Sequence, residues 1–335
     1  MSYYRPLAQT GPWRPEGAVP LAGGWTWFTH ALRLDRKAAP HVVAVDDMPL
    51  DTLNRLSRPR ADVAGLSMDA PRLMAILNAT PDSFSDGGRF DSPDAAARAA
   101  RALIAAGADI LDVGGESTRP GADEVDADAE IARVLPAIRA ARADWDGAIS
   151  IDTRKASVAR AAIGAGATML NDVSALGFDP DMAPTAADSG LPICLMHAQG
   201  APETMQDAPH YDDVVLDVFD ALAERIARAE AAGIRRDRIV VDPGIGFGKT
   251  LQHNLALIRN LALFHDLGCP ILLGASRKRF IGTLSDTDDA RARMPGSIAV
   301  ALAGIAQGVQ ISRVHDIAPT RQALTLWQAS TEVDP

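Results

Sequence analysis

The sequence predicts a (β/α)₈ barrel, a TIM barrel in the α/β class, preceded by a folded N-terminal extension. From Arg72 onward, eight short apolar runs alternate with Ala-rich amphipathic stretches. This alternation is typical of a parallel sheet with helices between its strands. Each apolar run also ends at polar or Gly-rich residues. Because the eight loops of a barrel meet at one face, the recurring polar ends favour a barrel over the alternative, a doubly wound sheet.

The chain divides into an extension, residues 1–70, and a barrel domain, residues 71–335. The extension holds three of the five Trp and two of the three Tyr, and it is neither of low complexity nor rich in charge. We therefore expect it to fold, with residues 41–45 as its most strand-like run. We expect it to pack against the barrel or a partner subunit, and its role is not assigned.

The eight apolar runs are the candidate barrel strands. They are short, and turn-forming or polar residues bound them, as expected of buried parallel strands. In chain order they are residues 73–77, 110–113, 148–151, 168–170, 192–196, 239–241, 271–273 and 309–314.

Amphipathic stretches between these runs are the candidate helices. The first follows Ser92 as the N-cap and Pro93 at the first helical position, and it ends at Gly107. Gly233 ends the helix before the sixth strand. The predicted helices include residues 95–106, 125–141, 214–232 and 254–264.

Polar side chains follow every predicted strand. Any one of them could instead cap a helix or solvate a loop. As a complete set they predict one polar pocket at the C-terminal strand ends. In chain order they are Asn78; Glu116, Thr118 and Arg119; Asp152, Thr153 and Arg154; Asn171 and Asp172; His197 and Gln199; Asp242; Ser276, Arg277 and Lys278; and Arg313, His315 and Asp316.

These residue types predict a polar heteroaromatic ligand that carries an anionic group. A buried carboxylate such as Asp242 can accept two parallel hydrogen bonds from adjacent ring N–H and amino groups. Lys278 can donate to a ring carbonyl. The segment 276–278 is expected to begin a helix, whose N–H groups favour a carboxylate or phosphate. Three further side chains supply positive charge for the anion: Arg119, Arg313 and His315.

Composition and spacing exclude several other classes. The formal net charge of −10 argues against a general nucleic-acid binder, which needs a basic face. Cys194 and Cys269 lack metal-ligand spacing and suit buried thiols in a reducing cytoplasm. We find no membrane-spanning stretch and no signal core, so a cytoplasmic protein is expected. Neither His197 nor His315 has a partner at metal-ligand spacing.

The segment 243–250, PGIGFGKT, is similar to two phosphate-binding motifs and matches neither. A Walker A loop requires glycine where Pro243 stands, and a dinucleotide fingerprint requires glycine where Lys249 stands. We expect its glycines to let the backbone approach a flat ligand closely.

Seven motifs in order resemble one family over about residues 72–330. They are LMAILNATPDSFSDGG, DVGGESTRPGA, IDTRKASVARAAIGAGATMLND, LMHAQGAPETMQ, DPGIGFGK, GASRKRFIG and RVHDI. Together they resemble dihydropteroate synthase. The resemblance implies that 6-hydroxymethyl-7,8-dihydropterin pyrophosphate and p-aminobenzoate give 7,8-dihydropteroate and pyrophosphate, a step of folate biosynthesis. It also implies Mg²⁺ as cofactor, a homodimer and inhibition by sulfonamides.

The resemblance implies a role for each motif residue. Asp152, Asn171, Asp242 and Lys278 would hold the pterin. Asn78, Thr118, Arg119, Arg313 and His315 would bind the pyrophosphate, with Asn78 also on Mg²⁺. Phe84, Pro120, Phe247 and Ser276 would frame the p-aminobenzoate pocket, with Ser276 receiving the carboxylate. Asp152, Lys278 and Arg119 would be the catalytic residues.

Two other functions stay as alternatives. A pterin-dependent methyltransferase that uses a corrinoid protein shares the barrel and the Asp/Asn set, but it needs neither SRK nor RVHD because it expels no pyrophosphate. A non-catalytic pterin-binding paralogue is disfavoured by the intact motif residues. One departure concerns packing: the family commonly has MHMQG, whereas this chain has MHAQG with Ala198.

Overall fold

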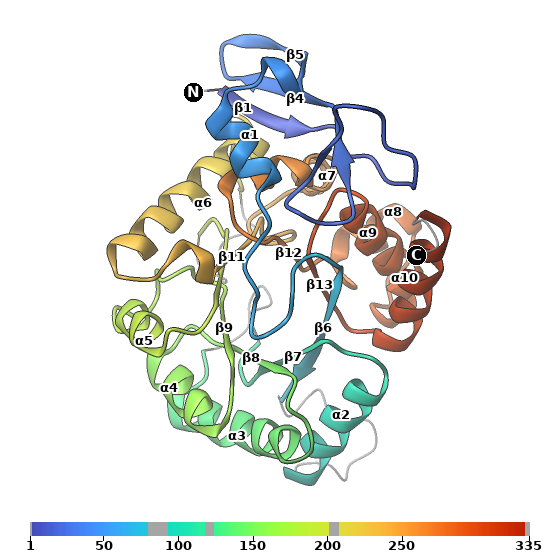
Figure 1. The fold of residues 1–335 in the computed structure, drawn as a ribbon. Helices are drawn as coiled ribbons and strands as arrows, with labels where there is room; N and C mark the ends of the chain where they lie inside the picture. Colours follow the sequence, from blue (N-terminus) through green and yellow to red (C-terminus); the bar gives the residue numbers. More distant parts are fainter. Residues whose placement is uncertain (1, 80–92, 118–123, 201–207, 332–335) are drawn as a thin grey trace.

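The computed structural model describes residues 2–79, 93–117, 124–200 and 208–331. Eight parallel strands form a barrel with helices around it (Figure 1). The strands are β6 (Arg72–Asn78), β7 (Ile110–Gly114), β8 (Ala148–Asp152), β9 (Met169–Asp172), β10 (Ile193–Met196), β11 (Ile239–Asp242), β12 (Leu272–Leu273) and β13 (Ile311–Val314). All eight predicted strands are confirmed.

The barrel closes between β11 and β12. Neighbouring strands are hydrogen-bonded in the order β11-β10-β9-β8-β7-β6-β13-β12. A bridge between Val241 and Ile271 joins the two ends, with the Val241 amide donating to the Pro270 carbonyl at 2.9 Å. A doubly wound sheet has two open edges, so this closure excludes it.

Each strand is followed by at least one helix. The helices are α2 (Pro93–Ala105), α3 (Ala127–Asp144), α4 (Ala156–Ala165), α5 (Met182–Ser189), α6 (Val214–Ala231), α7 (Leu251–Arg259), α8 (Arg279–Ser285), α9 (Met294–Ile305) and α10 (Ile317–Thr331). Short 3₁₀ segments are η3 (Arg236–Arg238), η4 (Leu261–Leu267) and η5 (Arg291–Arg293). Among the described helices, none is both long and apolar enough to cross a membrane.

Two helix predictions were wrong in detail. The single helix expected over 254–264 is divided at Asn260, where α7 ends and η4 begins. The Asn260 side chain donates to the Ala256 carbonyl at 2.8 Å and accepts from Arg5 at 2.8 Å, and these bonds compete with a continuous helix. The helix expected from residue 276 begins at Arg279, with Lys278 as its N-cap.

The N-terminal end of the barrel interior is apolar. One side chain from each strand joins a buried cluster there: Met74, Ile110, Ala148, Met169, Cys194, Val240, Leu272 and Ile311. Val63 and Met68, from the segment before β6, pack against these residues and cover that end. Both cysteines are buried, as predicted.

Strand side chains alternate, so the residues two positions further along each strand point inward again. On five strands these residues are Asp112, Ser150, Asn171, Asp242 and Arg313. The polar set therefore lies on the inner wall above the apolar layer, toward the C-terminal strand ends.

Residues 2–57 form a small layer of their own. A three-stranded antiparallel sheet pairs β1 (Ser2–Pro6), β4 (His30–Asp35) and β5 (Ala38–Ala44), and the strand predicted at 41–45 falls largely in β5. Beside it lie β2 (Val19–Pro20), β3 (Trp27–Phe28), η1 (Val45–Asp47) and α1 (Leu50–Ser57).

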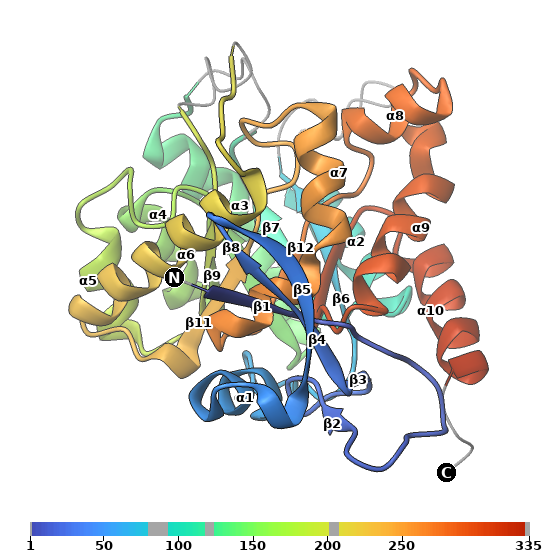
Figure 2. The ribbon, with the colours of Figure 1, turned by 90° about the horizontal axis from the view of Figure 1, so that it is seen from above.

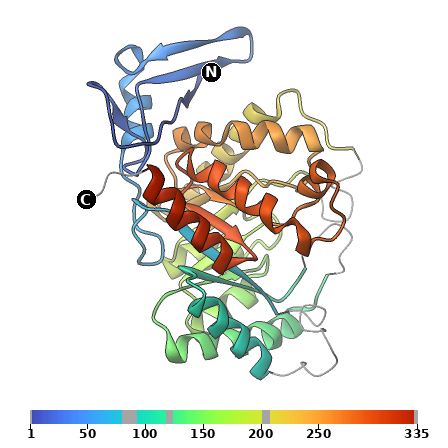
Figure 3. The ribbon, with the colours of Figure 1, turned by 90° about the vertical axis from the view of Figure 1, so that its right-hand side faces the viewer.

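The extension is docked on the barrel. Trp25 Nε1 donates to the Ile305 carbonyl at 2.9 Å, and Arg55 Nε donates to Asp266 Oδ1 at 2.9 Å. Figures 2 and 3 show the extension beside α6 and α7 and past the N-terminal end of the barrel. It leaves the C-terminal strand ends uncovered.

Candidate active site

The predicted pterin residues lie side by side on the barrel wall. Asp152 pairs in register with Asn171, and Asp242 ends the strand next to β10. All three side chains are buried. Asp152 Oδ1 is buried without a hydrogen-bond partner among the described residues. A buried carboxylate oxygen without a donor is costly, so this atom is suited to receive a donor from a ligand.

Arg313 links two carboxylates at the centre of the site. Its Nε donates to Asp112 at 2.6 Å and its Nη2 to Asp152 at 2.8 Å. Burial lowers the pKa of Arg313, but the two carboxylates more than offset this, so the net pKa is raised. The guanidinium therefore stays charged. Its Nη1 makes no hydrogen bond to a described residue, which leaves one nitrogen for an anion.

Asp112 is a site residue that the sequence reasoning missed. It is fully buried on β7 and accepts from Arg313 and, at 3.2 Å, from Asn171 Nδ2. Because the Asn171 amino group faces Asp112, its carbonyl oxygen is directed elsewhere and can accept from a ligand. The signal was a charged residue inside the apolar run 110–113.

Asp242 and Lys278 form the other side of the same site. Asp242 Oδ1 accepts from the Gly244 amide at 2.7 Å. Burial raises the pKa of Asp242, and the positive charge of Lys278 opposes this. Burial lowers the pKa of Lys278 to about 8, with Asp242 acting in the opposite direction. Lys278 Nζ donates to the Ile245 carbonyl and lies 4.4 Å from the centre of the Phe247 ring.

Two glycines after β11 let other parts of the protein, and not a ligand, come close to the backbone. Gly246 has a φ of +85°, and a Cβ there would lie 2.9 Å from the Lys278 side chain. Gly244 has a φ of +69°, and a Cβ there would lie 1.8 Å from the His197 carbonyl oxygen. Any larger residue at either position would displace the turn that carries Phe247.

The Lys249 side chain links this turn to His197. Its Nζ lies 3.0 Å from His197 Nδ1 and 2.9 Å from the Phe247 carbonyl. Burial, followed by the charge of Lys249, lowers the pKa of His197 to about 3, so the imidazole is neutral. Burial also lowers the pKa of Lys249, to about 7, and its amino group can donate to His197 Nδ1. His197 therefore helps to hold this turn in place.

Ser276 and His315 meet beside the site. The Ser276 hydroxyl lies 3.0 Å from His315 Nδ1 and accepts from the His315 amide at 3.2 Å. The residue expected to bind a carboxylate thus adjoins one expected to bind pyrophosphate. Ser276 precedes α8, a helix of seven residues, so the expected helix-start anion site is not formed by Ser276.

Other residues predicted for the site differ in where they lie. Asn78 ends β6 opposite Gly114, which is the neighbour of Asp152 on the next strand. Asp172 instead closes its own turn, accepting from the Ser174 amide at 2.8 Å and the Leu176 amide at 2.8 Å. Four predicted residues lie outside the described part of the chain: Phe84, Thr118, Arg119 and Pro120.

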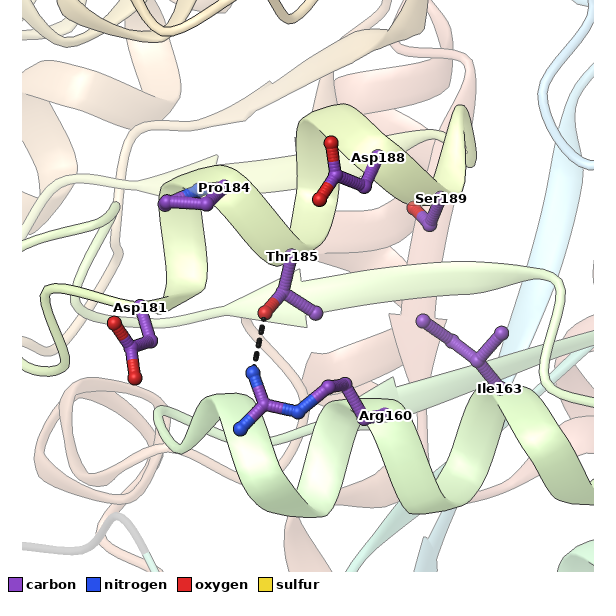
Figure 4. A pocket seen from close by; sticks show the side chains of 7 residues that line it. All are labelled: Arg160, Ile163, Asp181, Pro184, Thr185, Asp188 and Ser189. Atoms are coloured by element: carbon purple, nitrogen blue, oxygen red, sulfur yellow. Dashed lines mark hydrogen bonds between the residues drawn. The ribbon is translucent and has the colours of Figure 1, made fainter.

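A hollow of about 530 Å³ lies outside the barrel between α4 and α5 (Figure 4). Arg160 of α4 crosses it and donates to the Thr185 hydroxyl of α5 at 2.8 Å. It contains none of the strand-end residues. We therefore place the candidate site at the C-terminal end of the barrel.

Known proteins are similar to this chain over the whole barrel. A family of pterin binding enzymes matches residues 74–315. The dihydropteroate synthase of Escherichia coli K12 is 46% identical over 270 residues, covering 81% of this chain and 95% of its own.

Solved structures give the same result. Dihydropteroate synthase from Xanthomonas albilineans with 4-aminobenzoic acid superposes with a TM-score of 0.77 at 47% identity, covering 82% of this chain and 99% of its own. The same enzyme with 7,8-dihydropteroate gives a TM-score of 0.75 at 44% identity, covering 82% of this chain and 100% of its own. The chain therefore belongs to the pterin-binding enzymes and, within them, to the dihydropteroate synthases.

Proposed function

We propose that this chain joins 6-hydroxymethyl-7,8-dihydropterin pyrophosphate to p-aminobenzoate, giving 7,8-dihydropteroate and pyrophosphate. The observation that carries the proposal is the buried set of Asp152, Asn171 and Asp242, with Lys278 beside Asp242 and Arg313 between two carboxylates. The relatives that share this barrel carry the same activity in their names and bind a substrate or the product.

The pterin fits the hydrogen-bonding groups of the wall. Asp242 keeps Oδ2 for ring N–H and amino donors, because its Oδ1 is engaged by Gly244. Asn171 offers its carbonyl oxygen, and Lys278 donates to the ring carbonyl. A single ligand that carries all of these partners offsets the desolvation of the buried groups.

The reaction breaks the bond between the pterin methylene carbon and the pyrophosphate oxygen, and it forms a bond from that carbon to the amine nitrogen. Positive charge develops on the methylene as pyrophosphate departs. Asp152, whose Oδ1 accepts no hydrogen bond from the described residues, stabilises this charge electrostatically. The arylamine then releases one proton to solvent. Its lone pair is available at neutral pH, so no strong general base is needed.

Arg313 and His315 bind the leaving pyrophosphate, with Thr118 and Arg119 assigned to it from the sequence. Mg²⁺ fits Asn78 as a partial site: an amide oxygen is a hard ligand, and Mg²⁺ takes most of its ligands from phosphate and water. The described residues hold no cluster of three His, Cys, Asp or Glu that would bind a metal alone. When bound, Mg²⁺ would neutralise charge on the pyrophosphate.

The p-aminobenzoate pocket is assigned to Phe247 and Ser276, with Phe84 and Pro120 added from the sequence. The Phe247 ring provides a flat apolar face next to Lys278. The Ser276 hydroxyl, beside His315, provides a donor for the carboxylate. A sulfonamide has the same ring and a similar anionic end, so we expect it to compete with p-aminobenzoate.

We also propose that the chain forms a homodimer. Helix α9 is apolar along its length, and Ala299 and Ala303 on its outer side are exposed. A helix that is apolar all round is normally buried, so this face suits a second copy of the chain. Light scattering should give twice the mass of the chain, and a monomer at micromolar concentration would contradict the proposal.

The assay for the proposed reaction is pyrophosphate release with Mg²⁺, measured with and without p-aminobenzoate. The proposal predicts release that depends on p-aminobenzoate and equals dihydropteroate formed. Pterin binding without p-aminobenzoate-dependent product would instead favour a methyltransferase or a silent paralogue.

A further inference from the structure

The N-terminal extension contacts the barrel near its catalytic end through the turn between β4 and β5. In that turn, Arg36 donates to Asp217 at 2.7 Å and to Asp220 at 2.7 Å. Tyr3 joins them, donating to Asp220 at 2.9 Å and accepting from Arg36 at 3.3 Å. Both carboxylates lie in the first two turns of α6, which starts on the side of the C-terminal strand ends (Figure 2).

Asp217 connects Arg36 to the segment that enters α6. Its Oδ1 accepts from Arg36, while its Oδ2 accepts from the backbone amides of Asp212 at 3.0 Å and Asp213 at 3.2 Å. Asp213 caps α6, accepting from the Val215 amide at 3.0 Å. One carboxylate thus holds the extension and the chain leading to the helix.

Tyr211, directly before this segment, reaches the site. Its hydroxyl donates to the Gly248 carbonyl at 2.9 Å. Its ring meets His253 edge-on, with 5.0 Å between ring centres. Gly248 follows Phe247, the ring beside Lys278. A continuous series of contacts therefore runs from Arg36 to the aromatic wall of the p-aminobenzoate pocket.

We propose that Arg36 is a positioning residue: through Asp217, Tyr211 and Gly248, the N-terminal extension holds Phe247 against bound p-aminobenzoate. The inference rests on the proposed function, which places Phe247 in that pocket. The physical basis is that small displacements of a substrate-contacting group weaken binding and alignment.

The test is a double-mutant cycle on the steady-state formation of dihydropteroate. Arg36→Ala should raise the KM for p-aminobenzoate by about threefold to tenfold, the scale of indirect coupling. The KM for the pterin substrate should be unchanged. Tyr211→Phe should have a similar effect, and the double variant should show no further rise. Arg36→Lys, which can reach only one carboxylate, should be intermediate.

Arg55→Ala is the matched control, because Arg55 also joins the extension to the barrel, but at Asp266 in η4 and not at the segment that leads into α6. We expect both variants to lower the melting temperature, but Arg55→Ala should leave the KM for p-aminobenzoate unchanged. An unchanged KM in Arg36→Ala, an equal rise in Arg55→Ala, or multiplying effects in the cycle would overturn the proposal. Failure of the proposed function is distinguishable, because wild-type protein would then form no dihydropteroate, and both proposals would fall.

Discussion

The two ends of the barrel interior are built from the same strands, two residues apart, and they differ in every respect that matters for function. At the N-terminal end, inward side chains such as Ile110 and Val240 are apolar, and Val63 and Met68 cover them. At the C-terminal end, Asp112 and Asp242 follow on the same strands, and Asp152 carries a buried oxygen that has no hydrogen-bond partner in the part of the chain that the structure describes.

This difference separates stability from chemistry. The apolar end buries hydrocarbon, which stabilises the fold. The polar end gathers carboxylates and cations whose desolvation is only partly offset until a ligand arrives. Substitutions at the polar end should therefore change activity more than stability, and substitutions at the apolar end should do the reverse.

The largest effect is expected from Lys278→Ala at the polar end. Removing the ammonium that donates to the pterin should lower kcat/KM for the pterin substrate by about 100-fold to 1000-fold. The melting temperature should change less than the activity, because no packed core residue is lost and Asp242, once without the opposing charge of Lys278, can take up a proton instead of staying charged. Kinetics at sub-saturating pterin measure this, and a wild-type rate there would refute the assignment.

The reverse behaviour is expected from Ile110→Ala at the apolar end. Ile110 is fully buried, so the cavity should reduce the free energy of unfolding by about 2–5 kcal/mol. At a temperature where the variant is folded, kcat/KM should match wild type. Urea unfolding and kinetics on the same preparation check both parts. A loss of activity without a loss of stability would break the comparison.

The pH dependence of kcat/KM tests the charge states of Asp152 and Lys278 at the polar end. Burial raises the pKa of Asp152, and the positive charge of Arg313 opposes this rise. Asp152 must be ionised to act. Activity should therefore keep rising with pH beyond the pH range in which an ordinary aspartate ionises. Lys278 must be protonated, and burial lowers its pKa to about 8, so activity should fall as pH rises through 8. Below the pKa of Asp152 and above that of Lys278, kcat/KM should fall by about tenfold per pH unit. A flat profile from pH 5 to 9 would contradict both assignments.

The smallest effect is expected from Asn78→Ala. Losing one oxygen ligand should raise the Mg²⁺ concentration for half-maximal rate by about threefold to tenfold, because phosphate and water supply the other ligands. Titrating Mg²⁺ at saturating substrates measures this. Unchanged metal dependence would remove Asn78 from the metal site.

The barrel could be predicted because buried parallel strands are nearly continuous apolar runs, and their polar ends mark one face. Long-range contacts could not be predicted. The break at Asn260 depends on Arg5, some 255 residues away, and no local pattern reports it. The link from Arg313 to Asp112 and Asp152 joins residues 201 and 161 positions apart.

The site residues were predictable to different extents. Asp152, Asn171 and Asp242 stand at strand ends, so alternation and register place them together. Asp112 lies inside a strand, where only its charge distinguished it. The ion pair between Arg36 and Asp217 joins two charged residues of types that are usually found on the surface, and nothing in the sequence indicates that they pair.

The most direct test of the central claim is calorimetric titration of the dihydropterin pyrophosphate into Asp242→Asn, beside Asp172→Asn. Both aspartates are buried at strand ends, but Asp172 closes its own turn whereas Asp242 faces the site. The account predicts that Asp242→Asn weakens binding by about 100-fold or more, because the amino group of the new asparagine would face an N–H donor of the pterin ring in place of an acceptor. Asp172→Asn should bind as wild type does. Equal affinities for wild type and Asp242→Asn would contradict it.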